Sequence, residues 1–130
     1  MERAQPGFQV AGVHAVAPSF VETDWARVVH LYDLLLTVEP SPVVELNRAA
    51  ALSFASGPGE ALAVVDGLAA DPRLRAYPYL HTVRADLLRR VDRPAEASGE
   101  YAAALALTAN AAEREFLQGR LSEVARVGDR

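Results

Sequence analysis

Apolar residues recur along the chain at steps of three and four positions, the spacing that places side chains on one face of an α-helix. The pattern is strongest where Trp25, Val28, Val29, Tyr32, Leu35 and Leu36 follow one another. Alternation with a period of two, which is typical of strands, is absent. The sequence therefore predicts an all-α protein, with Trp25 and Tyr32 in its core because they share a stripe with Val28 and Leu35.

Proline, glycine and capping residues divide this pattern into about seven segments of helical length. Ser41 followed by Pro42 is typical of a helix start, and Ser56–Gly59 is typical of a tight turn between two helices. The predicted helices are a segment of about ten residues from Pro6, then Trp25–Val38, Pro42–Ala55, Pro58–Ala70, Tyr77–Val91, Pro94–Leu107, and a last helix after the cap at Thr108–Asn110.

The last helix is expected to close the array, because a stack of helices needs a final member with a polar outer face. We expect its buried side to be formed by Phe116, Leu117, Leu121 and Val124. We expect the opposite, polar side to be formed by Glu113, Arg114, Glu115 and Arg120. Residues Arg126–Arg130 are expected to fray.

Identical residues recur 36 positions apart in two stretches that begin at Pro42 and Pro78. The matched pairs are Pro42/Pro78, Arg48/Arg84, Ala49/Ala85, Leu52/Leu88, Pro58/Pro94, Glu60/Glu96 and Ala61/Ala97. No gap is needed to align them, so the chain contains an internal repeat of a helix pair.

This period resembles that of the tetratricopeptide (TPR) family, whose helix–turn–helix units are about 34 residues long. Ala61 and Ala97 match the small residue that opens the second helix of a unit, and Tyr101 matches its aromatic residue. The first-helix tryptophan position of the family holds Glu45 in one stretch and His81 in the other. The resemblance implies a TPR-like helical hairpin repeat that forms an α-α superhelix, with Phe8–Pro40 as a degenerate first unit.

Length and charge limit the possible functions. The 130 residues suit a single domain, residues 1–130, that is large enough to bury a core. The formal net charge of -4, with basic residues scattered along the chain, argues against direct nucleic-acid contact. Long apolar runs and cysteines are both absent, so we expect a cytoplasmic protein without a membrane segment or a disulfide.

The sequence contains no recognisable catalytic or metal-binding pattern. His30 and Asp33 can share a helix face, but no third ligand stands at a metal-binding spacing, and His14 has no such neighbour. The Ser56–Gly59 turn lacks the strand and the lysine of a phosphate-binding loop. No nucleophile elbow is recognisable. We therefore expect no enzyme activity, no catalytic residue, no metal and no cofactor.

A partner-binding groove is the remaining candidate, because the first helices of stacked units line a concave surface. The predicted groove residues are Asn47, Arg48, His81 and Arg84, with the two arginines at equivalent places in the repeat and able to clamp an acidic group. The alternative is that both arginines pair with nearby carboxylates such as Glu45 or Asp86 and hold the stack together.

Several motifs, taken in order, resemble the C-terminal extension of a group of bacterial extracytoplasmic-function (ECF) RNA polymerase sigma factors. The motifs are Asp24-Trp25 followed by LYDLL at 31–35, then SPVVELNRA at 41–49, and then NAAEREFL at 110–117. The resemblance extends from Gln9 to Val124. Asp92 stands where that family tends to have Gly, and Phe20-Val21 where it tends to have small or acidic residues.

The resemblance implies a regulatory domain that follows the sigma regions, so that this chain is a C-terminal fragment of a longer factor. Its expected partners are proteins: its own sigma regions, RNA polymerase or a regulatory partner. Promoter DNA would be contacted by the full-length factor and not by this domain. The alternatives are a free-standing TPR-like adaptor that binds peptides, and a small-molecule sensor or enzyme.

Overall fold

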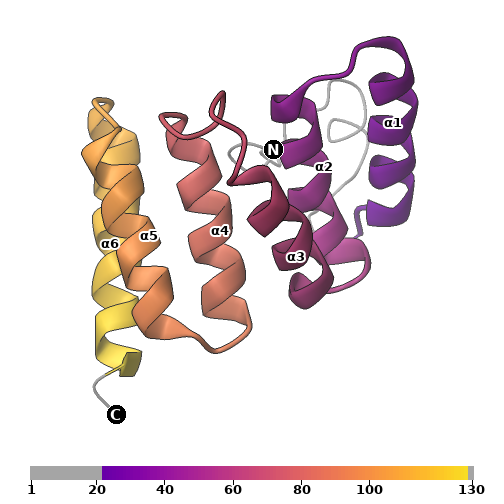
Figure 1. Cartoon of the computed structure of the whole chain (residues 1–130). Helices are drawn as coiled ribbons and strands as arrows, with labels where there is room; N and C mark the ends of the chain where they lie inside the picture. Colours follow the sequence, from indigo (N-terminus) through magenta and orange to yellow (C-terminus); the bar gives the residue numbers. More distant parts are fainter. Residues whose placement is uncertain (1–21, 129–130) are drawn as a thin grey trace.

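The computed structural model describes residues 22–128, which form six α-helices joined by short connections. They are α1 (Trp25–Val38), α2 (Pro42–Ala55), α3 (Pro58–Leu68), α4 (Pro78–Arg90), α5 (Pro94–Ala106) and α6 (Ala111–Gly128) (Figure 1). No strand occurs in this part of the chain, so the all-α prediction is confirmed. The helix count is six within these residues and not about seven; the helix expected from Pro6 lies outside them.

The helix starts follow the capping chemistry of the sequence. The Asp24 carboxylate accepts a hydrogen bond of 3.1 Å from the backbone N–H of Arg27 at the start of α1. Asn110 does the same for the N–H of Glu113 at 2.9 Å. The helix ends differ slightly from expectation, since α3 stops at Leu68 and α6 continues to Gly128.

Helices that are consecutive in the chain pack side by side, so that α1 and α6 lie at opposite ends of the row (Figure 1). Helices α2 and α4 also come into contact, although α3 separates them in the chain. This contact places the first helix of one predicted pair next to the first helix of the other.

Small residues at equivalent positions of the repeat lie at the helix contacts. Ala49 and Ala85 are fully buried on α2 and α4, and Ala61 and Ala97 are fully buried on α3 and α5. Tyr101, four residues after Ala97 on the same face of α5, is also fully buried. Trp25 and Tyr32 are buried as predicted, but Leu35, expected on the same stripe, is 42% exposed because no neighbouring element within residues 22–128 covers that part of α1.

The turn between α4 and α5 explains a departure from the sigma-factor pattern. Asp92 has a φ of 63°, the left-handed conformation that favours glycine. The N–H of Arg93 donates to the carbonyl of Leu88 (2.9 Å) and that of Asp92 to Arg89 (3.1 Å), the bonds that close a helix around a left-handed residue. Asp92 therefore occupies the backbone role in which glycine is commoner.

Two features of the core differ from the sequence prediction. The connection between α3 and α4 contains Leu74, which is fully buried although it lies outside any helix. On α6, Leu117 and Val124 are buried as expected, but Phe116 is 44% exposed. The guanidinium of Arg120 lies 5.2 Å from the centre of the Phe116 ring, because residues four apart share a helix face. The expected placement of Phe116 and Arg120 on opposite sides is thus wrong.

Replacing Ala97 by Leu should lower the free energy of unfolding by about 1–3 kcal/mol, because added methyl groups overpack a filled contact. Chemical denaturation of the Ala97→Leu variant measures this change. The matched control is Ala102→Leu, at an exposed position of the same helix. Equal stability of the two variants would show that α5 does not pack through Ala97.

Candidate functional site

Helices α2, α4 and α6 line a cavity of about 500 Å³. This volume lies within the range of about 300–1,000 Å³ that is usual for ligand pockets. The cavity has apolar walls, and its polar and charged lining includes Asn47, Ser53, Thr82, Asp86, Arg90 and Arg120. It is therefore a candidate binding site on the face formed by the first helix of each predicted pair and the last helix.

Arg90 connects the ends of two of these helices. One of its terminal nitrogens donates to Ser53 Oγ at 2.7 Å and the other to the Ser53 carbonyl at 3.0 Å. The guanidinium also lies 4.5 Å from the centre of the Phe54 ring. Burial lowers the pKa of Arg90, and the negative charge of Asp86 opposes that shift. Arg90 thus fixes α4 to α2 and places a partly desolvated positive charge beside the cavity.

Asp86 is already compensated within the protein. Its carboxylate accepts a hydrogen bond from the Tyr101 hydroxyl, and its Oδ1 lies 3.6 Å from a terminal nitrogen of Arg89. Burial, followed by the charge of Asp86, raises the pKa of Tyr101. The cavity therefore contains a carboxylate whose partners come from α4 and α5 and do not depend on a ligand.

Arg120 of α6 also lines the cavity. Its Nε is buried and has no hydrogen-bond partner among the residues that the structure describes. Its nearest ion pair is with Glu123, at 3.6 Å and partly exposed. The guanidinium lies against the half-exposed Phe116 ring, so a positive donor and an apolar surface stand side by side on α6.

The four residues predicted as groove residues do not lie together. Asn47 lines the cavity, whereas Arg48, His81 and Arg84 are not among its lining residues. Arg48 donates through Nε to Asp33 Oδ1 of α1 at 2.6 Å. The binding role of the four stays a prediction, but three of them are engaged in contacts between helices.

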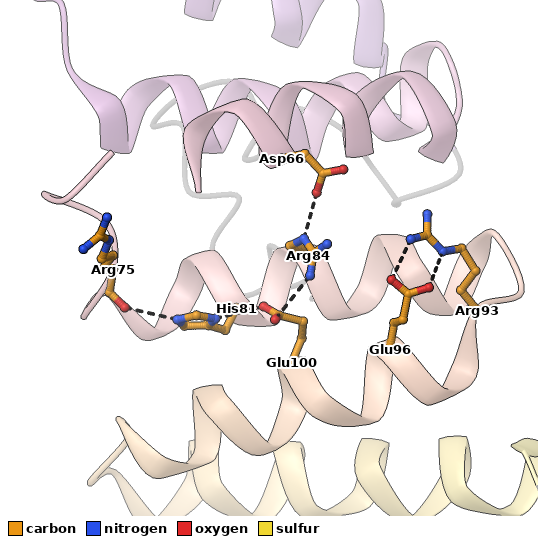
Figure 2. Close-up of polar contacts among 7 residues, drawn as sticks. All are labelled: Asp66, Arg75, His81, Arg84, Arg93, Glu96 and Glu100. Atoms are coloured by element: carbon orange, nitrogen blue, oxygen red, sulfur yellow. Dashed lines mark hydrogen bonds and ion pairs between the residues drawn. The ribbon is translucent and has the colours of Figure 1, made fainter. Parts of the chain in front are cut away.

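Arg84 is the centre of a polar seam that we define as Asp66, His81, Arg84 and Glu100. Figure 2 shows its guanidinium between Asp66 of α3, at 2.8 Å, and Glu100 of α5, at 3.2 Å. The hydrogen bond to Asp66, and then the charges of Glu100 and Asp66, raise the pKa of Arg84 against the effect of burial. One arginine of α4 therefore links three consecutive helices.

His81 extends this seam toward the connection that precedes α4. Its Nδ1 lies 2.9 Å from Glu100 Oε1, and its Nε2 lies 3.1 Å from the carbonyl oxygen of Arg75 (Figure 2). Both ring nitrogens therefore face oxygen atoms of the protein. These contacts hold α4, α5 and the preceding connection together.

The expected partners of the two arginines, Glu45 and Asp86, are not the ones that the structure shows. Arg48 and Arg84 instead pair with carboxylates on the preceding helix. In each case the next residue, Ala49 or Ala85, is fully buried, so the arginine stands at the border of the core with its charged end directed to a neighbouring helix.

Sequence reasoning missed Phe54, Arg90, Phe116 and Arg120 as cavity residues. Two signals could have found them. Phe54 and Arg90 are 36 positions apart, so they occupy the same place in neighbouring units and can meet. Phe116 and Arg120 are four apart on one predicted helix, so they share a face.

In the part of the chain from residue 22 to residue 128, no three His, Cys, Asp or Glu side chains gather closely enough to hold a metal ion. None of its helices combines the length and the apolar character that crossing a membrane requires. The chemistry of the described region therefore centres on the cavity and the polar seam.

Comparison with known proteins gives one informative relative. The chain is 40% identical over 116 residues to an uncharacterized protein of Rhizobium meliloti (strain 1021). The match covers 89% of this chain but 27% of that protein, so the chain spans about a quarter of the length of the relative. No protein-family model and no solved structure matches the chain.

Replacing Arg84 by Met should lower the free energy of unfolding by about 1 kcal/mol, because ion pairs of a partly buried guanidinium to two helices are lost. Urea denaturation of Arg84→Met measures this loss, and high salt should reduce it. Arg126→Met, at an exposed position of α6, is the control. A variant as stable as this control would contradict a structural role for Arg84.

Alkaline pH should weaken the fold partly through Tyr101. Its raised pKa means that the folded state keeps the phenol proton while the unfolded chain releases it above pH about 10. The free energy of unfolding therefore falls as the pH rises above that value. Tyr101→Phe should show a shallower fall than the parent chain when denaturation is compared at neutral and alkaline pH. Parallel curves would contradict the assignment.

Proposed function

We propose that this chain is the regulatory, protein-interaction domain of a bacterial ECF RNA polymerase sigma factor, built as a TPR-like α-α superhelix. In this proposal the domain docks on its own sigma regions, on RNA polymerase or on a regulatory partner, and so controls transcription initiation in the cytoplasm. It does so without enzyme activity and without touching promoter DNA itself.

The cavity on the α2, α4 and α6 face is the observation that carries the proposal. A stack of helix pairs exposes the first helix of each pair along one side, where polypeptides bind in repeat proteins. The cavity is lined by α2, α4 and α6, which supports this arrangement, and buried alanines recur at matched positions of the two helix pairs. Its lining combines aromatic rings with a few charged groups, as binding surfaces for proteins do.

The residues that carry the sigma-factor resemblance have structural roles that support a shared fold. Asp33, within LYDLL, pairs with Arg48, within SPVVELNRA. Arg114, within NAAEREFL, donates to the carbonyls of Leu105 (2.7 Å) and Thr108 (2.9 Å) and so closes the end of α5. These motifs therefore favour the same helix packing, and the function follows from the resemblance rather than from these contacts.

The length of the relative supports the same proposal. A similar sequence occupies 27% of the Rhizobium meliloti protein, which leaves most of that polypeptide for other regions. A regulatory domain that acts on the rest of its own chain requires such an arrangement. The activity of the whole Rhizobium meliloti protein is likewise proposed here and not observed.

A calorimetric titration tests the function. The sigma regions encoded in frame before this domain, expressed separately, should bind it with a measurable heat and a defined stoichiometry. Sigma regions from a factor that lacks such an extension are the control and should give no heat. A reading frame without sigma regions, or silence in a titration with polymerase as well, would contradict the proposal and leave the free-standing adaptor.

A further inference from the structure

We propose that the outward face of α1 is an interaction surface for residues 4–21, the segment that precedes this helix in the same chain. The outward face is defined by Leu31, Leu34, Leu35 and Val38. Its occupant is an uncharged, apolar stretch of polypeptide that the chain itself supplies. This inference goes beyond the proposed function and does not depend on the sigma-factor role.

Helix α1 carries apolar side chains on two sides. One side, which includes Trp25, is buried, and α2 is the helix against which α1 packs. Steps of three and four residues place a second stripe on another side of the helix, formed by Leu31, Leu34, Leu35 and Val38. Leu34 is 50% exposed, Leu35 42% and Val38 82%. The other residues of the described range 22–128 therefore leave this stripe largely uncovered.

The opposite end of the row of helices has a different outer surface (Figure 1). The exposed side of α6 opposite its buried residues is polar, and it is formed by Glu115, Gln118, Ser122 and Arg126. The last helix of a stack needs such a polar face because water covers it. The outward face of α1 lacks this polarity, so it has the character of a surface on which another element packs.

Residues 4–21 have the composition that fits this surface. They contain no Asp, Glu, Lys or Arg, and no other stretch of the chain without these residues is as long. Their apolar residues include Phe8, Val13 and Val16, within the helix that the sequence pattern predicts from Pro6. An uncharged segment can cover an uncharged stripe without burying an unpaired charge. The two surfaces are therefore complementary.

The place of the segment in the chain makes the contact attainable. Each described helix packs against the helix that follows it, and a segment before α1 that packs on α1 obeys the same rule. Residues 17–24 can span roughly 26 Å when extended, whereas the axes of packed helices lie about 10 Å apart. Helix α1 has 14 residues and is about 21 Å long, so a helix of about ten residues can lie along it.

A second copy of the chain fits the outward face less well. A pair of α1 helices would contribute one stripe of four side chains from each copy, whereas stable interfaces bury about 1,200 Å² or more in total. A segment of the same chain needs less area, because its attachment gives it a high effective concentration. Coverage of α1 by residues 4–21 also leaves the face of α2, α4 and α6 as the surface for the docking proposed above.

Paramagnetic relaxation in the full chain tests the proposal. The sequence has no cysteine, so a nitroxide label can be attached to Val13→Cys alone. The methyl signals of Leu34 and Val38 should lose most of their intensity, compared with the same sample after the nitroxide has been reduced. The signals of Leu107, which is 42% exposed at the end of α5, should keep theirs.

Stability provides an independent readout. Leu34→Glu should lower the melting temperature by about 4 °C or more, because the segment would cover the new charge. The matched control is Leu107→Glu, which should change the melting temperature little. Val13→Glu should cause a loss similar to that of Leu34→Glu. The chain with both Val13→Glu and Leu34→Glu should lose less than the sum, because substitutions at contacting residues are not additive.

Three results would overturn the inference: unchanged α1 signals, additive losses for Val13→Glu and Leu34→Glu, or a Leu34→Glu variant as stable as Leu107→Glu. A mixed sample distinguishes a second copy, with the nitroxide on one chain and the isotope label on another. Loss of the α1 signals in that sample, as large as within one chain, would assign the face to a dimer and overturn the proposal. None of these results decides the titration with the sigma regions, so the proposed function fails separately.

Discussion

The close approach of neighbouring helices at buried alanines is the constraint on which the other features depend. Ala49, Ala61, Ala85 and Ala97 leave no exposed surface and no side chain large enough to separate the helices. Larger side chains such as Tyr101 are fully buried as well, as the close packing of a protein core requires. Helices α2 and α4 come into contact, and together with α6 they line the cavity.

Arginine provides the second set of constraints. The chain has no lysine, so every basic side chain is a planar guanidinium suited to directional hydrogen bonds. Arg48 and Arg84 join helices through carboxylates, whereas Arg90 and Arg114 do so through backbone carbonyls at helix ends. The guanidinium groups of these four arginines are therefore engaged in contacts within the protein. Arg120 differs from them, because its Nε lies buried without an acceptor in the described structure.

The two polar regions of the molecule therefore have different roles. The seam of Asp66, His81, Arg84 and Glu100 is satisfied internally, and it stabilises the packing of α3, α4 and α5. The cavity combines aromatic rings with the guanidiniums of Arg90 and Arg120. Arg84, which the repeat matches to Arg48, belongs to the seam, whereas Phe54 and Arg90 at the ends of α2 and α4 line the cavity.

The sequence by itself determined the helices and their repetition, because prolines, caps and apolar spacing act within a few residues of one another. It placed Trp25 and Tyr32 correctly in the core, but not Leu35, which is 42% exposed. The tertiary structure decided which polar residues face each other across helices. The partners of Arg84 lie on two other helices, and Phe116 is half-exposed because its place on α6 faces the cavity. Such choices depend on helix rotation and separation in space, and local spacing along the chain does not fix either quantity.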